Sequence, residues 1–312
     1  MNIIFFGECM VEKSIHEKTE MGVNKELKFG GDTLNSALYF SRLNENNAFN
    51  IFYATAVGTD KLSQSLLKEW KSEMIDTRLV IIKDNKTVGS YEIKTDKDGE
   101  RCFNYNRSDS AVRYYFENKL SSLEKALKNG SCDYFYFSGI SLAILSDDDK
   151  LFLIGILKNY KKMGGKIIFD SNYRPQLWTN SDPQIYYQYA MNLADIAFLS
   201  DEDEYTLYSE RNINQIIERL KKYTINEVII KQGKNPCVII NKSQKISVAG
   251  QKAEHLVDTC AAGDSFSAGY LSKRLNGFSI EDSAKYGHQI AAQVIQYSGA
   301  IVPKRFWSTP YS

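Results

Sequence analysis

The sequence predicts an α/β fold, with a three-layer α/β/α core around a mainly parallel sheet and a small β-sheet lid. Short apolar runs of strand length alternate along the chain with longer segments whose apolar residues recur at helical spacing. This alternation is typical of a parallel sheet with helices on both faces. Polar or glycine-rich residues follow several predicted strands, at the edge where such sheets bind ligands. One stretch in the first third alternates polar and apolar residues instead, and it predicts the separate small sheet.

Length and composition indicate one large domain that spans residues 1–312. Lys and Arg number 39 against 38 Asp and Glu, so no surface for nucleic acid or a membrane is indicated. Five scattered cysteines without a C-x-x-C pair favour free thiols in a reducing compartment. The apolar start has no basic flank, and no apolar run reaches the roughly 20 residues of a membrane span. We therefore expect a cytoplasmic protein.

The first elements of the chain form two strand–helix units. Residues 3–6 are a short apolar run that ends in a glycine and a glutamate, which predicts a buried strand delivering polar residues to a site. Gly30 and Gly31 precede a helical pattern that continues to residue 43. A glycine pair there permits close approach of a ligand to the backbone, or it makes an ordinary tight turn. A second strand at residues 51–57 and an amphipathic helix at residues 60–74 follow.

A hairpin is predicted between residues 87 and 107. Polar and apolar residues alternate there around an Asp-Gly dipeptide at residues 98–99, which is a strong hairpin signal. The period of two places Tyr91 on one face of the first strand, and Tyr105 and Arg107 on one face of the second. Two tyrosines and an arginine make a plausible contact surface for a sugar acid, although strand tyrosines more often pack on the body of a protein.

The rest of the chain alternates regularly between strands and helices. Strands are predicted at residues 133–138, 166–170, 196–199 and 227–232, an antiparallel pair at 237–241 and 245–248, and helices at 147–163, 183–193, 201–208, 213–223, 265–274 and 280–297.

The stretch VDTCAAGDSFSAGY, at residues 257–270, carries the strongest chemical signal. The small residues Ala261, Ala262 and Gly263 let the backbone approach a ligand closely, and amides at the start of a helix favour an anion. Asp264 beside such a site is unfavourable unless its carboxylate takes a proton, as the base of a phosphoryl transfer to a hydroxyl does. Alternatively, Asp264 is only the N-cap of the helix that follows.

This stretch resembles the C-terminal signature of the ribokinase/PfkB sugar kinases, and FGGDTLNSALYFSRL at residues 29–43 resembles their N-terminal signature. Three further stretches resemble the 2-keto-3-deoxygluconate kinases of that family in order and spacing: GECMVE at residues 7–12, FNYNRSDSAV at 103–112 and FDSNYRPQLW at 169–178. The resemblance extends from residue 7 to residue 303. It implies the ribokinase-like fold, in which residues of about 11–29 and 87–108 form the lid.

The resemblance also implies an activity, the ATP-dependent phosphorylation of the terminal hydroxyl of 2-keto-3-deoxygluconate. Two alternatives stay open on the sequence. One is a kinase for a neutral sugar such as fructose or ribose, or for a nucleoside, in which the arginines would be structural. The other is a catalytically silent sensor of a sugar acid or a nucleotide, although a sensor needs no base such as Asp264.

The site residues can be assigned by their match to the family. Asp264 matches the base, and the amides of Ala261, Ala262 and Gly263 match the anion hole, although many members have glycine in place of Ala261. Positions that contact the hydroxyls and the carboxylate of the acceptor are matched by Gly31, Asn35, Tyr91, Tyr105, Arg107 and Arg174. A pair of arginines suits a carboxylate better than a neutral sugar.

For the nucleotide, the resemblance places four residues around the adenine and ribose: Lys231, Gly233, Ala292 and Ser298. Ser200 and Glu204 fall where the family has an Asn-x-x-Glu pattern near Mg²⁺ and the phosphates, so we expect Glu204 to bind the metal through water. Ser200 replaces the asparagine, and the choice among Asp201, Asp203 and Glu204 as the acidic partner stays open.

Further expectations concern a second cation and assembly. The family's site for a monovalent cation such as K⁺ would lie beside Asp258. An exposed sheet face on the lid invites pairing with a second copy of the chain, so we expect a homodimer or a higher oligomer.

Overall fold

A mostly parallel sheet runs through the centre of the computed structural model, which describes residues 1–14, 28–95, 101–118, 121–242 and 244–309. Within these residues the sheet has ten strands, in the order β14-β13-β12-β11-β10-β9-β1-β4-β5, with β6 paired to β4. Neighbours from β12 to β5 are parallel, whereas β13 pairs antiparallel with both β12 and β14. The parallel strands therefore end at one shared edge, where their polar residues meet.

The strands of this sheet are β1 (Asn2–Phe6), β4 (Asn50–Val57), β5 (Ile75–Asp76), β6 (Val80–Ile82), β9 (Tyr134–Ser138), β10 (Lys166–Asp170), β11 (Ile196–Ser200), β12 (Glu227–Gln232), β13 (Asn235–Asn241) and β14 (Lys245–Val248). The helices are α1 (Asp32–Arg42), α2 (Lys61–Ser72), α3 (Ser122–Lys128), α4 (Gly139–Ala143), α5 (Asp147–Lys162), α6 (Pro183–Leu193), α7 (Asp201–Tyr208), α8 (Ile213–Leu220), α9 (Ala262–Arg274) and α10 (Ile280–Val294).

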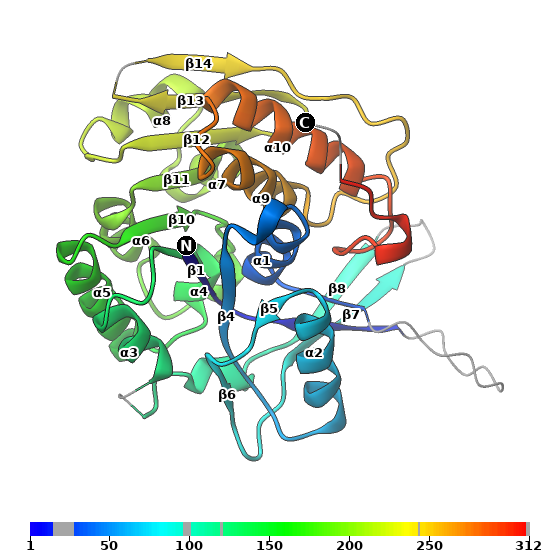
Figure 1. The fold of residues 1–312 in the computed structure, drawn as a ribbon. Coiled ribbons are helices and arrows are strands. Elements are labelled where there is room, and N and C mark those ends of the chain that lie inside the picture. The colour runs from blue at the N-terminus through cyan, green and yellow to red at the C-terminus, as the bar shows by residue number, and fades with distance from the viewer. Residues whose placement is uncertain (15–27, 96–100, 119–120, 243, 310–312) are drawn as a thin grey trace.

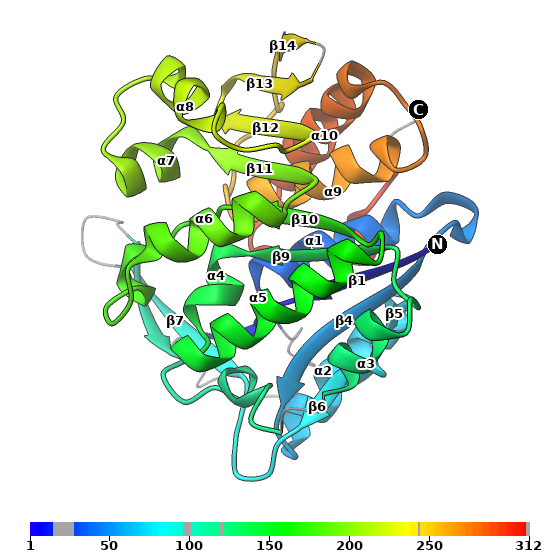
Figure 2. The ribbon, with the colours of Figure 1, turned by 90° about the vertical axis from the view of Figure 1, so that its left-hand side faces the viewer.

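Helices cover the sheet on both faces, as the predicted three-layer fold requires. Helices α3, α5 and α6 lie on one face and α1, α9 and α10 on the other (Figures 1 and 2). Each face has its own cluster of buried apolar side chains, one built with Leu153 and Leu157 of α5 and the other with Leu34 and Leu38 of α1 and Leu271 of α9. The predicted fold class is therefore confirmed.

A separate sheet of four strands stands beside the main sheet. Its order within the described residues is β3-β2-β7-β8, from β2 (Met10–Ser14), β3 (Phe29–Gly30), β7 (Gly89–Thr95) and β8 (Arg101–Asn106). These strands lie in the two segments predicted to form the lid, although residues 15–27 and 96–100 are outside the described part. The register sets Tyr91 opposite Tyr105, with ring centroids 6.2 Å apart, so the two tyrosines share a face as expected.

The long helices and strands follow the predicted boundaries to within a few residues, and five of them match the predicted bounds: β10, β12, β14, α6 and α7. Four short elements, α3, α4, β5 and β6, were not predicted from the sequence. These elements have two to seven residues, which is too short for a period to stand out. In the described residues, no helix has both the length and the apolar character needed to cross a membrane.

Candidate active site

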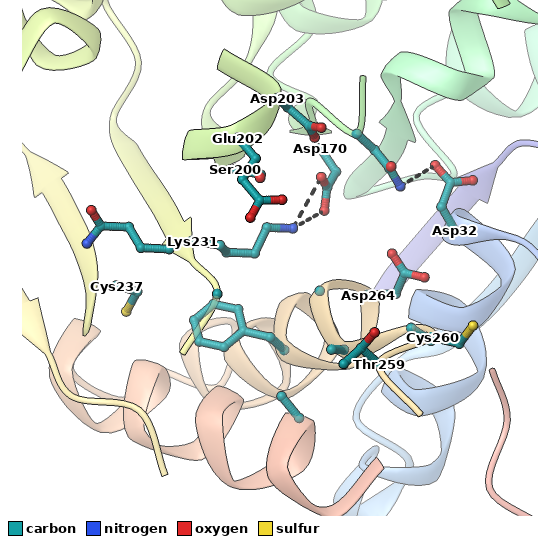
Figure 3. A pocket seen from close by; sticks show the side chains of 18 of the residues that line it. Asp32, Asp170, Ser200, Glu202, Asp203, Lys231, Cys237, Thr259, Cys260 and Asp264 are labelled. Carbon is teal, nitrogen blue, oxygen red and sulfur yellow. Dashed lines mark hydrogen bonds and ion pairs between the residues drawn. The ribbon is translucent and has the colours of Figure 1, made fainter. Parts of the chain in front are cut away.

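A cavity of about 730 Å³ opens where β10, β11 and β12 end and α9 begins. Ten of the residues singled out in the sequence line it: Arg174, Ser200, Asp203, Lys231, Gly233, Asp258, Ala261, Ala262, Gly263 and Asp264. Figure 3 shows Asp264 and Lys231 with their carboxylate neighbours at its centre. Strand ends and one helix start thus bring together residues that are far apart in the chain.

The turn that leads into α9 differs from the expected one. The helix begins at Ala262, three residues earlier than predicted, and its N-cap is Ala261 with a left-handed backbone (φ 58°, ψ 14°). Asp264 therefore lies inside the first turn, and the interpretation of Asp264 as the N-cap is wrong. The Ala262 amide donates to the carbonyl of Thr259 at 3.2 Å, so this member of the expected anion hole already has a partner.

The Asp264 carboxyl has an environment suited to a base. Its pKa is raised to about 7, first by burial and then by the negative charge of Asp32. Asn35 of α1 donates from Nδ2 to Asp264 Oδ2 at 2.8 Å, which opposes that rise. Asn35 was expected to contact the acceptor sugar, and here it holds the carboxylate of Asp264. A carboxyl with a pKa near neutral pH accepts a proton efficiently under ordinary conditions.

Two further acidic residues that sequence analysis did not assign stand beside Asp264. Asp170, at the end of β10, accepts from Lys231 Nζ at 3.0 Å and from the Tyr136 hydroxyl at 3.1 Å. Asp32, at the start of α1, accepts from Asn172 Nδ2 at 3.1 Å, and burial raises the pKa of Asp32 (Figure 3). Their positions, at the end of a predicted strand for Asp170 and directly after the glycine pair for Asp32, were the available signal.

The two arginines expected at a carboxylate have different surroundings. The Arg174 side chain is 50% exposed, lies 3.5 Å from Asp203, and lines the cavity. Arg107 instead forms a buried ion pair with Glu8, whose second oxygen accepts from Ser110 at 2.6 Å. Arg107 does not line this cavity; together with Tyr105 it lines a neighbouring hollow of about 490 Å³. The charge of Arg107 is therefore already compensated within the protein.

Tyr91 lies in the small sheet with most of its side chain covered. Its hydroxyl donates to Glu12 Oε2 at 3.3 Å, and burial followed by the charge of Glu12 raises the pKa of Tyr91. The phenol is therefore protonated at neutral pH and can act as a hydrogen-bond donor.

Gly31 contributes conformation rather than an open contact surface. Its φ of 148° strains residues with a side chain, and a Cβ there would lie 2.0 Å from the carbonyl oxygen of Glu8. The close approach that this glycine permits is thus to the protein's own β1–β2 connection.

Glu204 does not lie where a metal ligand was expected. It is buried in an ion pair with Arg219, which also binds Glu210 at 2.8 Å, and burial raises the pKa of Glu204 to about 7. Glu204 is absent from the cavity wall, which Glu202 and Asp203 line beside Ser200. Glu204 points away from the cavity because it lies on the face of α7 that packs toward α8. Asp203 stands three residues after Ser200, which is the spacing of the Asn-x-x-Glu pattern.

Only some of the residues expected at the adenine and ribose line the cavity. Gly233 lines the cavity, with Phe266, His288 and Ala291 nearby on its wall. Ala292, next to Ala291, does not line it. Ser298 lines a different hollow that also includes Val302.

Comparisons with known proteins agree with this geometry. A family model described as pfkB family carbohydrate kinase matches residues 2–306. The chain is 42% identical over 307 residues to a 2-dehydro-3-deoxygluconokinase of Escherichia coli strain K12, with 97% of each chain covered. It is 39% identical over 310 residues to the 2-dehydro-3-deoxygluconokinase of Haemophilus influenzae, with 97% and 96% covered.

Two solved structures show the same fold at lower identity. The 2-dehydro-3-deoxygluconokinase of Thermotoga maritima has a TM-score of 0.79 at 20% identity, covering 97% of this chain and 96% of that one. Fructokinase with bound ATP from Xylella fastidiosa has a TM-score of 0.79 at 19% identity, covering 96% and 93%.

Proposed function

Because the chain belongs to the pfkB family of carbohydrate kinases, we propose that it transfers the γ-phosphoryl group of ATP to the terminal hydroxyl of 2-dehydro-3-deoxygluconate, also called 2-keto-3-deoxygluconate. The observation that carries this proposal is the position of Asp264. Its carboxyl lies in the first turn of α9 at the cavity wall and has a pKa of about 7. Relatives that are 39% and 42% identical over nearly the whole chain support the choice of acceptor.

In this mechanism Asp264 takes the proton from the acceptor hydroxyl as its oxygen attacks the γ-phosphorus of ATP. The bond from that phosphorus to the β–γ bridging oxygen breaks, and ADP leaves. The first-turn amides of α9, Gly263 among them, face the negative charge that builds on the phosphoryl oxygens. Asn35 keeps the Asp264 carboxylate in place during the transfer.

For the acid group of the substrate, the structure favours Arg174 over Arg107. Arg174 lines the cavity and is half-exposed, so its guanidinium can form two parallel hydrogen bonds to a carboxylate. Arg107 is paired with the buried Glu8 and would contact a substrate only while remaining bound to that glutamate. Tyr105 lines the neighbouring hollow together with Arg107, so a role of Tyr91 and Tyr105 in covering the acceptor and keeping water from the phosphoryl group stays a prediction.

The charges of the cavity fit Mg²⁺ bound together with ATP. In the described part of the chain, the cationic side chains Arg174 and Lys231 face six carboxylates that line the same wall: Asp32, Asp170, Glu202, Asp203, Asp258 and Asp264. Phosphates entering such a cavity require further positive charge. Asp203 and Glu202 would hold the ion, directly or through water, and the ion would neutralise phosphate charge.

Two expectations stay predictions. Asp258, beside which K⁺ was expected, accepts hydrogen bonds from the amides of Cys260 and Gly299 and so joins two loops. A homo-oligomer formed through the small sheet stays a prediction in the same way. Activity with and without K⁺, and light scattering of the purified protein, test these two points.

A coupled assay of ADP release from the purified protein tests the proposed function. We expect turnover with 2-dehydro-3-deoxygluconate and much lower kcat/KM with fructose, ribose and nucleosides. Good turnover of a neutral sugar beside none of the acid would refute the proposed acceptor, while leaving the kinase assignment intact.

A further inference from the structure

The ammonium group of Lys231 stands at the start of α9. Its Nζ lies 3.0 and 3.3 Å from the two carboxylate oxygens of Asp170 and 3.4 Å from Ser267 Oγ. A Cβ built on Gly263 would be 3.4 Å from the same Nζ, so the ammonium is in contact distance of the turn that carries Asp264. Figure 3 shows the side chain extending from β12 toward Asp170 and away from Cys237.

This position differs from the one that the family resemblance implied for Lys231. A lysine at the adenine or ribose would point along the wall that holds Gly233 and His288. In the structure, Lys231 instead stands beside the first turn of α9. Among the described residues it is the only cationic side chain that β12 contributes to the cavity. An ammonium at that place would meet the phosphate end of the nucleotide.

Asp170 is built to hold the ammonium there. The carboxylate is 2% exposed and accepts hydrogen bonds from Tyr136 and Ser267, at 3.1 Å each, besides its pair with Lys231. Those two bonds fix its orientation, because both hydroxyls come from buried residues of β9 and α9. A lysine side chain has many rotamers, and one fixed carboxylate selects the rotamer that faces the turn.

Given the proposed function, we propose that Lys231 is a catalytic residue that contacts the phosphoryl group during its transfer, and that Asp170 is the positioning residue that holds Lys231 in place. As the bond to the acceptor oxygen forms and the bond to the leaving oxygen of ADP breaks, the ammonium stabilises the negative charge on the transferring group. The proton of the acceptor still goes to Asp264, and Lys231 takes no part in the proton transfer.

Nucleotide binding without acceptor tests the place of Lys231. We expect Lys231→Met to weaken ATP at least tenfold and ADP less, and to leave AMP unchanged, in calorimetric titrations of the purified protein. The matched control is Lys234→Met, which removes an exposed lysine in the turn that follows β12. Equal loss of affinity for ATP, ADP and AMP would place Lys231 at the nucleoside and overturn the proposal. This readout does not depend on which sugar is the acceptor.

A double-mutant cycle on kcat tests the role of Asp170. We expect Asp170→Asn to lower kcat at least tenfold and to weaken ATP no more than Lys231→Met does, and we expect the double variant D170N/K231M to be no slower than Lys231→Met alone. Multiplying losses would show that Asp170 acts independently of Lys231 and overturn its positioning role. Thermal melts of each variant identify any that fail to fold, in which case the titrations with Lys231→Met decide.

The pH profile supplies a second readout that loss of packing would not produce. Charged or titratable groups face Asp264 from four other elements: Asp32 and Tyr39 of α1, Tyr136 of β9, Asp170 of β10 and Lys231 of β12. The charge of Asp170 raises the pKa of Asp264 and that of Lys231 lowers it. The acidic limb of kcat/KM should therefore move to lower pH in Asp170→Asn and to higher pH in Lys231→Met. Shifts in the same direction would contradict the proposed arrangement.

Discussion

Asn35 donates a hydrogen bond of 2.8 Å to the carboxylate of Asp264, joining the start of α1 to the start of α9 across 229 residues of sequence. The bond fixes the carboxylate that we propose as the base, and it favours the ionised form. The two helices also pack against each other. The bond therefore links the N-terminal glycine-pair helix to the site of phosphoryl transfer.

Removing this bond should shift the pH dependence of catalysis. In Asn35→Ala the ionised Asp264 loses a hydrogen bond, so the pKa of Asp264 rises above about 7. The acidic limb of kcat/KM then moves to higher pH, which a profile from pH 5 to 9 measures. Ser36→Ala is the control, because Ser36 donates at 3.3 Å to the backbone carbonyl of Asp264 rather than to its carboxylate. An unmoved limb in Asn35→Ala would mean that Asp264 is not the titrating base.

Asp264→Asn should abolish catalysis and alter stability with a definite sign. We expect kcat to fall by about 10²–10⁴-fold, the range of a lost general base, with ATP affinity kept. Since folding raises the pKa of Asp264 from 3.8 to about 7, ionisation destabilises the folded state, and stability is lost as pH rises through this window. The variant should therefore gain stability over the parent, by about 1–2 kcal/mol, at pH 8 but not at pH 4. Urea unfolding at both values measures this.

The two arginines should respond differently to alanine. Arg174→Ala removes a half-exposed cation. We expect the sugar acid to lose roughly 1.5–3 kcal/mol of binding free energy, measured as a rise in its KM, with little change in Tm. Arg107→Ala leaves the buried Glu8 without its cation and should destabilise the fold by about 3 kcal/mol. Glu8→Gln combined with Arg107→Ala should recover part of that stability. Equal effects of the two single variants on Tm would contradict the burial difference.

Substitutions of the two acidic residues Asp203 and Glu204, which follow β11, should distinguish a metal-binding role from a structural one. Asp203→Asn should raise the Mg²⁺ concentration for half-maximal activity by about tenfold, as expected on losing one charged ligand. Glu204→Gln should leave that concentration unchanged, because Glu204 binds Arg219 away from the cavity. Titrations of Mg²⁺ at saturating ATP compare the two, and a larger effect of Glu204→Gln would restore the original expectation for Glu204.

Gly31 should tolerate no side chain. In Gly31→Ala the new Cβ would clash with the carbonyl of Glu8 at a φ of 148°, and we expect a loss of more than about 2 kcal/mol in the free energy of unfolding. Gly155→Ala is the matched control, since nothing lies within 4 Å of a Cβ in that helix position. It should gain about 0.5–1 kcal/mol instead. Chemical denaturation measures both variants.

Much of the fold was predictable from the sequence, because a strand or a helix with one buried face has apolar residues at a regular spacing along the chain. The alternating apolar runs located the long elements, and the Asp-Gly dipeptide located the hairpin of the small sheet. The short elements α3, α4, β5 and β6 show no such spacing, since they span too few residues. Their existence depends on contacts with neighbouring segments.

The site was predictable only where one local stretch held the signal. The small residues before Asp264 indicated an anion site with a base, and the structure places this aspartate at a cavity. The same stretch suggested an N-cap, and only the left-handed Ala261 at the true helix start excluded it. Glu204 illustrates the limit, because spacing along the chain did not show that Arg219 of the next helix would bind it.

The sequence by itself therefore determined the type of fold, the order of its elements and the chemical character of the turn at Asp264, all of which are written in local patterns. The tertiary structure alone decided which side chains meet: Asn35 with Asp264, Asp170 with Lys231, and Arg107 with Glu8. The physical reason is that the order of strands in the sheet brings distant segments to one edge. The charge and pKa of a group at that edge depend on its neighbours in space, and a local sequence pattern does not identify them.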